Sequence, residues 1–84
     1  MDISGAWRSS RDFNYRISQQ GSQFTWEAPQ AAERGSGTIS GRSVNASWTG
    51  RMGSGTAHGT VEVGADGRAT AIRWDNGVVF RKQN

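Results

Sequence analysis

Residues 13–28 read Phe-Asn-Tyr-Arg-Ile-Ser-Gln-Gln-Gly-Ser-Gln-Phe-Thr-Trp-Glu-Ala. On both sides of the glycine, large apolar residues alternate with polar ones. A period of two is typical of β-strands that have one buried face and one exposed face. The stretch therefore predicts a β-hairpin whose tip is Gln20-Gly21 and in which Ile17 lies opposite Phe24.

The same alternation continues along the chain in both directions. Val44, Ala46 and Trp48, for example, are separated by single polar residues. Glycine is abundant, with 12 residues, and proline occurs once, which suits short strands joined by tight turns better than helices. We therefore predict eight strands, over residues 3–8, 12–19, 22–28, 36–40, 43–49, 56–63, 68–74 and 78–82.

Three further turns test whether these alternations agree with one another. Gly41-Arg42 and Asp66-Gly67 suit two-residue hairpin loops, and Asp75–Gly77 suits a three-residue loop with a left-handed glycine. Each turn brings inward-facing residues of its two strands opposite one another on a common face. The resulting pairs are Ile39–Val44, Gly35–Trp48, Val63–Thr70, Val61–Ile72, Gly59–Trp74, Trp74–Val78 and Ile72–Phe80.

One stretch shows no strand pattern. Pro29–Arg34 suits either a single helical turn that ends at Gly35 or a plain loop. We expect it to connect the third and fourth strands.

The predicted fold is all-β, a single domain over residues 1–84. Eight short strands joined by hairpins form an antiparallel up-and-down meander, and no helix is predicted that would cover its apolar face. Closing the sheet into a small barrel buries that face and removes the sheet edges. A two-sheet β-sandwich is the alternative.

The composition excludes several classes of site. The 84-residue chain has no cysteine and one histidine, so neither a disulfide framework nor a thiolate metal site is available. We predict no metal and no cofactor. No apolar run is long enough for a membrane span. The composition leaves the cellular compartment open.

The eight-strand meander, with Gly5-Ala6-Trp7 in its first strand, resembles the lipocalin and avidin-like (calycin-type) barrels. The resemblance implies a barrel that holds a small apolar or amphipathic ligand in its mouth. The chain is shorter than a lipocalin and lacks that family's cysteines and C-terminal helix, so the resemblance implies an architecture and no specific ligand.

The four tryptophans are the main candidates for a ligand site. Trp7, Trp26, Trp48 and Trp74 fall in the first, third, fifth and seventh predicted strands, which run in the same direction. We therefore expect all four indoles to point inward at one end of the barrel, with Tyr15 as an accessory. Two interpretations remain open, because the rings either plug the core or line a mouth that stacks a small ligand, which would be apolar, flat and aromatic, or sugar-like.

Small residues near the tryptophans fit both interpretations. Inward-facing glycines, such as Gly35 and Gly59, leave space beside a ring or let an indole cover a bare neighbour. The glycine-rich segment 50–55 is either a flexible connector or a lid in which Arg51 reaches an anionic ligand.

The sequence favours a non-catalytic binding or structural module over an enzyme. His58 is expected to face outward, and no serine or threonine has an evident paired base. The alternative is a surface protein-interaction module, either a homodimer or part of a larger protein. Nucleic acid is a less favoured partner, since the basic residues are scattered. The outward arginines that would form a basic stripe if the first and last strands meet are Arg8, Arg16, Arg73 and Arg81.

Overall fold

The computed structural model describes residues 2–51 and 53–83, which form eight β-strands and a 3₁₀ turn but no α-helix. The eight predicted strands are confirmed, although β4 begins at residue 33 rather than 36 and β6 at residue 53 rather than 56. The elements are β1 (Gly5–Ser9), β2 (Asn14–Gln20), β3 (Gln23–Ala28), η1 (the 3₁₀ turn Pro29–Ala31), β4 (Glu33–Ser40), β5 (Ser43–Gly50), β6 (Gly53–Val63), β7 (Ala69–Trp74) and β8 (Val79–Lys82).

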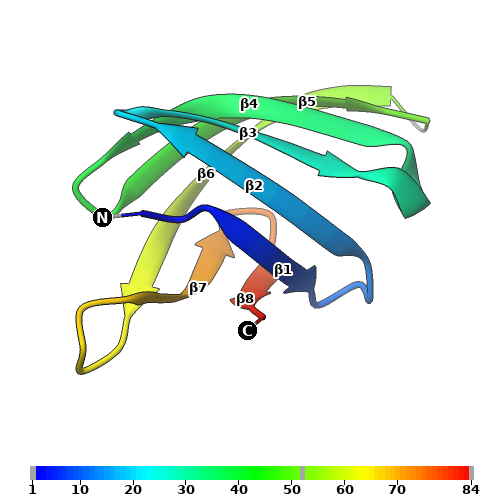
Figure 1. Ribbon diagram of the computed structural model, residues 1–84. Coiled ribbons are helices and arrows are strands. Elements are labelled where there is room, and N and C mark those ends of the chain that lie inside the picture. The colour runs from blue at the N-terminus through cyan, green and yellow to red at the C-terminus, as the bar shows by residue number, and fades with distance from the viewer. Residues whose placement is uncertain (1, 52, 84) are drawn as a thin grey trace.

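The sheet closes into a barrel (Figure 1). Each strand pairs antiparallel with the next, and β8 pairs antiparallel with β1, where Ser9 lies opposite Phe80. Closure buries the apolar face without a covering helix. The predicted up-and-down barrel is therefore confirmed, and the two-sheet sandwich is not formed. This architecture is compatible with the calycin-type barrel that the sequence resembles.

The hairpin between β4 and β5 has the predicted register. Ile39 lies opposite Val44, and Gly35 lies opposite Trp48. Gly41 has a φ of 59°, a left-handed conformation that glycine favours at the first position of a two-residue hairpin loop. The three-residue loop Asp75–Gly77 between β7 and β8 is also confirmed, because the N–H of Trp74 donates to the carbonyl of Val78 and Gly77 has a left-handed φ of 88°.

The hairpin between β2 and β3 differs from the prediction. Its loop residues are 21 and 22, so Ile17 lies opposite Trp26 rather than Phe24. Both primed hairpin turns need a positive φ at the first loop position, which Gly21 supplies with a φ of 60° and Gln20 does not. Because the partner changes by two residues, the same side chains stay inside the barrel.

The turn between β6 and β7 also differs from the prediction, because it is wider. It spans residues 64–68 rather than Asp66-Gly67 alone, and its glycine has a φ of 79°. A register shift beside Val63 brings this residue opposite Ala69 rather than Thr70. An Asp-Gly pair fits a three-residue loop with a left-handed glycine as well as it fits a two-residue turn.

The connection between β3 and β4 contains the predicted helical turn. Pro29–Ala31 is a 3₁₀ turn, and proline suits its first position because its φ is already helical. The turn ends at Ala32, whose φ is 51°, rather than at Gly35.

Buried apolar side chains fill the barrel, and Ile3 closes the end at which the odd-numbered strands begin. The N–H of Ile3 donates a hydrogen bond to Gln19 Oε1 at 2.9 Å. The carbonyl of Ile3 accepts one from Trp7 Nε1, also at 2.9 Å, and Trp7 is fully buried. Burying a large aromatic side chain contributes roughly 4–6 kcal/mol before entropy is counted.

Three tryptophan rings of the core lie directly opposite glycines on neighbouring strands. At one of these glycines, Gly35, an added Cβ atom would lie only 2.2 Å from Trp26 Cε2, so the indole occupies the space of the missing side chain. The inward-facing glycines therefore make room for indoles, which is one of the two roles that the sequence left open. The pairs are Trp26–Gly35, Trp48–Gly55 and Trp74–Gly59.

We predict that Gly35→Ala lowers the free energy of unfolding by about 1–3 kcal/mol, because the methyl group collides with the Trp26 ring. Gly50→Ala is the matched control, since its Cβ would meet Glu33 Cβ at an ordinary 3.5 Å. We expect the control to change stability by less than about 0.5 kcal/mol. Urea denaturation measures both variants, and equal effects would contradict the packing described here.

Candidate ligand site at the aromatic end of the barrel

The connections that follow β1, β3, β5 and β7 lie at one end of the barrel, since the odd-numbered strands run in the same direction. We call this end of the barrel the aromatic end. A cavity of about 80 Å³ lies among its side chains. The aromatic side chains that line its cavity are Tyr15, Trp26, Trp48, Trp74 and Phe80.

Three rings at the aromatic end, those of Trp26, Trp74 and Phe80, are steeply inclined to one another. Trp26 and Trp74 have ring centroids 5.8 Å apart and planes 54° apart. Phe80 meets Trp26 at 87° and Trp74 at 70°, while Tyr15 packs against Phe80 at a centroid distance of 4.3 Å. Trp48 is only half-buried. Phe24 stacks on Trp26 with planes 18° apart and Tyr15 is tilted by only 30° from Phe80, so part of the ring surface is already covered, and the cavity lies among the ring surfaces that remain.

Two polar side chains reach the cavity from loops that local hydrogen bonds hold in place. Arg11 lies in the loop after β1, and its backbone N–H donates to the hydroxyl of buried Ser9 at 3.2 Å. Asn76 lies in the loop after β7, and its Oδ1 accepts a hydrogen bond from the N–H of Val78 at 3.0 Å. Arg11 forms no ion pair with any residue that the structure describes.

The indole N–H groups of two cavity tryptophans differ in their partners. Trp26 Nε1 donates to Glu33 Oε2 at 2.9 Å, and Glu33 is half-buried at the start of β4. Trp74 is only 6% exposed, and its buried Nε1 has no hydrogen-bond partner among the described residues. A buried donor of this kind requires an acceptor. Trp74 lines the cavity, so one of the lining residues carries a buried donor that is not used within the described part of the chain.

Tyr15 is buried beside these groups, and its environment changes its acidity. Burial raises the pKa of the Tyr15 phenol, and the negative charge of Glu33 raises it further. A hydrogen bond with Ser9 and the positive charge of Arg11 act in the opposite direction and are smaller. The phenol therefore stays neutral and keeps its proton at physiological pH.

The structure brings together four of the residues that the sequence singled out. Trp7 is inward-facing as predicted, but it does not line the cavity and its N–H bonds to the carbonyl of Ile3. The expectation that all four indoles share one site therefore holds for three of them. The four residues that line the cavity are Tyr15, Trp26, Trp48 and Trp74.

Arg51 is exposed and does not line the cavity. It follows Gly50, the last residue of β5, and β6 already begins at Gly53. The predicted flexible segment 50–55 is thus mostly strand, and the lid prediction also involves Met52, which lies outside the described residues.

Sequence reasoning did not single out the four other polar or aromatic residues that line the cavity, which are Arg11, Glu33, Asn76 and Phe80. Glu33 and Arg11 lay in segments predicted to be connections, and Asn76 was treated only as a loop residue. Phe80 was predicted to face inward, which was the one available signal for it. The polar residues gave no periodic signal because they lie in or beside loops.

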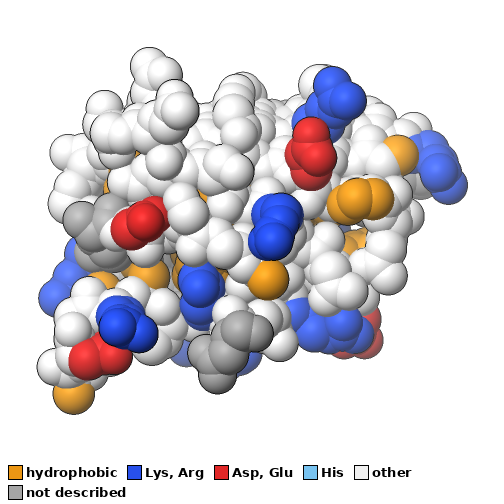
Figure 2. All heavy atoms as spheres, viewed as in Figure 1, with side chains coloured by type: hydrophobic (Ala, Val, Ile, Leu, Met, Phe, Trp, Pro, Cys, Tyr) orange, Lys and Arg blue, Asp and Glu red, His pale blue; other side chains and the backbone are white. Residues whose placement is uncertain are grey.

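The outer surface of the barrel is divided by charge. Arg8 lies opposite Arg81 where β1 meets β8, as expected for the outward arginines. Arg73 forms an ion pair with Glu62 at 2.7 Å, and Arg8 lies 3.5 Å from Asp12. Acidic groups thus interrupt the basic stripe. In Figure 2, cationic side chains gather over the lower part of the molecule, where β1, β7 and β8 lie.

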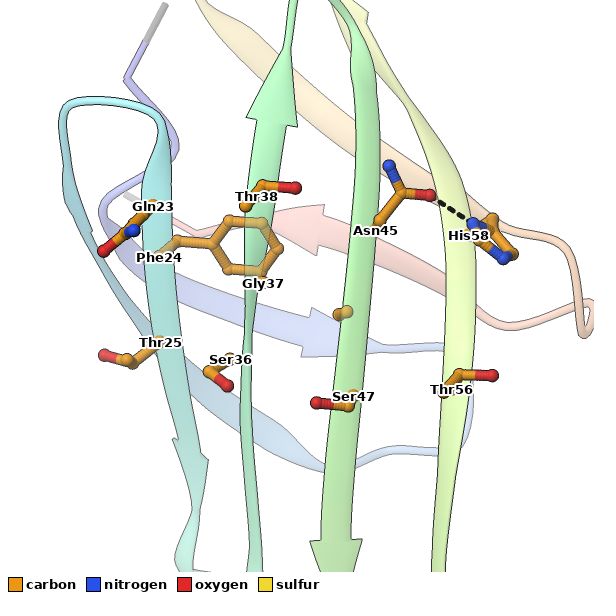
Figure 3. Close-up of a pocket in the computed structure, with 11 residues that line it drawn as sticks. Gln23, Phe24, Thr25, Ser36, Gly37, Thr38, Asn45, Ser47, Thr56 and His58 are labelled. Carbon is orange, nitrogen blue, oxygen red and sulfur yellow. Dashed lines mark hydrogen bonds between the residues drawn. The ribbon is translucent and has the colours of Figure 1, made fainter.

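The middle of the outer face of β3 to β6 instead carries no charged side chain and forms a shallow groove of about 590 Å³ (Figure 3). The exposed Glu27 and Arg34, which lie opposite one another on β3 and β4, do not line this groove. Side chains in the groove stand in rows across the strands, without Asp, Glu, Lys or Arg. His58 faces outward as predicted and hydrogen-bonds Asn45. One row is Thr25, Ser36, Ser47 and Thr56, and the next is Gln23, Thr38, Asn45 and His58.

Within residues 2–51 and 53–83, no three His, Asp or Glu side chains gather closely enough to hold a metal ion. Among the same residues, no helix has the length and hydropathy needed to cross a membrane. The chain matches no protein-family model, no curated protein and no solved structure. Inferences about function therefore depend on the geometry of the barrel itself.

We predict that Tyr15 titrates above the usual phenol pKa of 10.0 in the folded protein and returns to it on unfolding. The sequence has one tyrosine, so ultraviolet absorbance of tyrosinate reports this residue directly. Because the folded pKa is raised, ionisation favours the unfolded chain. Tyr15 should therefore leave stability unchanged below about pH 10 and lower it as the pH rises further. A pKa of Tyr15 in the folded protein equal to the usual phenol value of 10.0 would contradict the burial of this side chain.

Proposed function

We propose that the protein is a non-catalytic binding module whose aromatic end holds a small flat or apolar group of a ligand. The observation that carries this proposal is the buried, unpartnered Nε1 of Trp74 among inclined aromatic rings. A ring cluster that served only as a core plug has no need of an unused donor beside a cavity.

The size of the cavity limits what enters it. Pockets that enclose drug-sized ligands measure roughly 300–1,000 Å³. An engineered apolar cavity of about 150 Å³ holds benzene. The cavity here measures about 80 Å³, so it suits one end group of a larger molecule, and the remainder would lie outside across the loops.

The groups around the cavity support binding rather than catalysis. Glu33 is the one carboxylate among the described lining residues, and its Oε2 already accepts the N–H of Trp26. Tyr15 also lines the cavity, but its raised pKa keeps the phenol protonated at physiological pH, so it does not act as a general base there. His58, the sole histidine, projects from the outer face of β6 instead.

A second candidate is a protein-interaction module that uses the outer face of β3 to β6, for example in a homodimer. The neutral groove of about 590 Å³ on this face favours it.

Tryptophan fluorescence tests the proposal. Trp48 is half-buried, so we expect acrylamide to quench part of the emission and a bound small molecule to shift and protect it. Trp48→Ala should abolish this response, whereas Ser47→Ala, an outward substitution at the adjacent position, should preserve it. If Ser47→Ala abolishes the response and Trp48→Ala does not, the outer face is the binding surface.

A further inference from the structure

The buried indole N–H of Trp74, a residue that lines the cavity, requires a hydrogen-bond acceptor that an occupant could supply. Trp74 is 6% exposed and Nε1 is its only polar side-chain atom, so the ring cannot satisfy it by turning toward solvent. An indole N–H donates and never accepts. An occupant that ends in hydrocarbon alone would leave this donor unsatisfied.

A matching acceptor lies at the start of β4. Glu33 Oε2 accepts the Trp26 N–H, and Glu33 Oε1 has no partner among the described residues. A carboxylate oxygen only accepts hydrogen bonds. The occupant is therefore expected to offer one acceptor, for Trp74, and one N–H or O–H donor, for Glu33.

The charges around the cavity disfavour an ionic occupant. An anionic group would face the Glu33 carboxylate, and a cationic group would face Arg11 and the positive edge of the Trp74 indole. Arg11 and Glu33 balance each other formally, so a neutral dipolar group incurs neither repulsion. The aromatic faces supply the remaining contact and suit a small methyl group.

We infer that the group held at the aromatic end is the acetamido group, CH₃–CO–NH–, of an N-acetylated amino sugar. Its carbonyl oxygen accepts the hydrogen bond of Trp74 Nε1, its N–H donates to Glu33, and its methyl group packs among the rings. A planar group of a few atoms is compatible with the cavity of about 80 Å³. This inference rests on the binding role proposed above and specifies the chemistry of the same site.

Trp48 favours a sugar over an acetylated peptide as the carrier of this group. Trp48 is half-buried, lies against Gly55, and has no ring contact with the other aromatic residues described. A flat indole face at a mouth is suited to the C–H face of a pyranose ring. Arg11 is within the same lining and can donate to sugar hydroxyls.

Calorimetric titration with N,N′-diacetylchitobiose tests the inference, with glucosamine and glucose as ligands that lack the acetyl group. We expect saturable binding of N,N′-diacetylchitobiose and no binding of glucosamine or glucose. Trp74→Phe, which keeps a ring but removes the N–H, should weaken binding by about threefold to tenfold. Circular dichroism checks that the variant is folded.

Glu33→Gln provides a second variant that does not depend on the core ring. It should weaken binding severalfold, because an amide oxygen is a poorer acceptor than a carboxylate. Glu27→Gln is the matched control, since Glu27 is exposed on β3 and does not line the cavity. Equal affinities of Glu33→Gln, Glu27→Gln and the parent protein would overturn the assignment of the donor contact.

Four other outcomes would overturn the inference. Glucosamine binding as tightly as the acetylated sugar would exclude the acetamido contact, and N-acetyl-lysine amide binding as tightly would exclude the sugar. If no acetamido compound binds but another compound changes Trp48 fluorescence, the acetamido assignment fails and the binding role stands. If nothing binds, both fail, and water alone satisfies Trp74 Nε1.

Discussion

Close contact between indole rings and the bare backbone of glycines is the constraint on which this barrel depends. A chain of 84 residues without cysteine must obtain its stability from apolar packing, and its tryptophans supply the largest buried surfaces. Eight strands enclose too little space for bulky residues on every strand. Glycines opposite Trp26, Trp48 and Trp74 provide the missing space, so one arrangement both stabilises the barrel and inclines the rings around a cavity.

Most of the fold could be predicted because two independent signals agree. The period-two alternation assigns each side chain to a face, and the turns must then join strands without reversing that assignment. At the β2–β3 hairpin the prediction placed Gln20 at the first loop position, where primed turns need a positive φ, but the residue with that φ is Gly21. The Asp66-Gly67 turn also differed from the prediction, because an Asp-Gly pair suits both a two-residue turn and a three-residue loop. Neither difference moved a buried residue to the surface.

The candidate site was less predictable, because hydrogen bonds carry no periodic signal. The inward orientation of the tryptophans followed from the strand pattern. That Trp7 bonds to the carbonyl of Ile3 depends on how the N-terminal segment folds over the barrel end. Glu33 was missed because β4 begins earlier than its alternation indicated, directly after the 3₁₀ turn. The polar part of the site thus arises from loop geometry, while its aromatic part arises from the strands.

The most direct test of the aromatic end as a binding site is a nuclear Overhauser experiment on the protein with N,N′-diacetylchitobiose. If the aromatic end is the site, the acetyl methyl protons show cross-peaks to the ring protons of Trp26 and Trp74, and the Trp7 indole resonance does not change. Cross-peaks to Thr25 or Thr56 on the outer face, or no cross-peaks to any indole, would contradict this assignment.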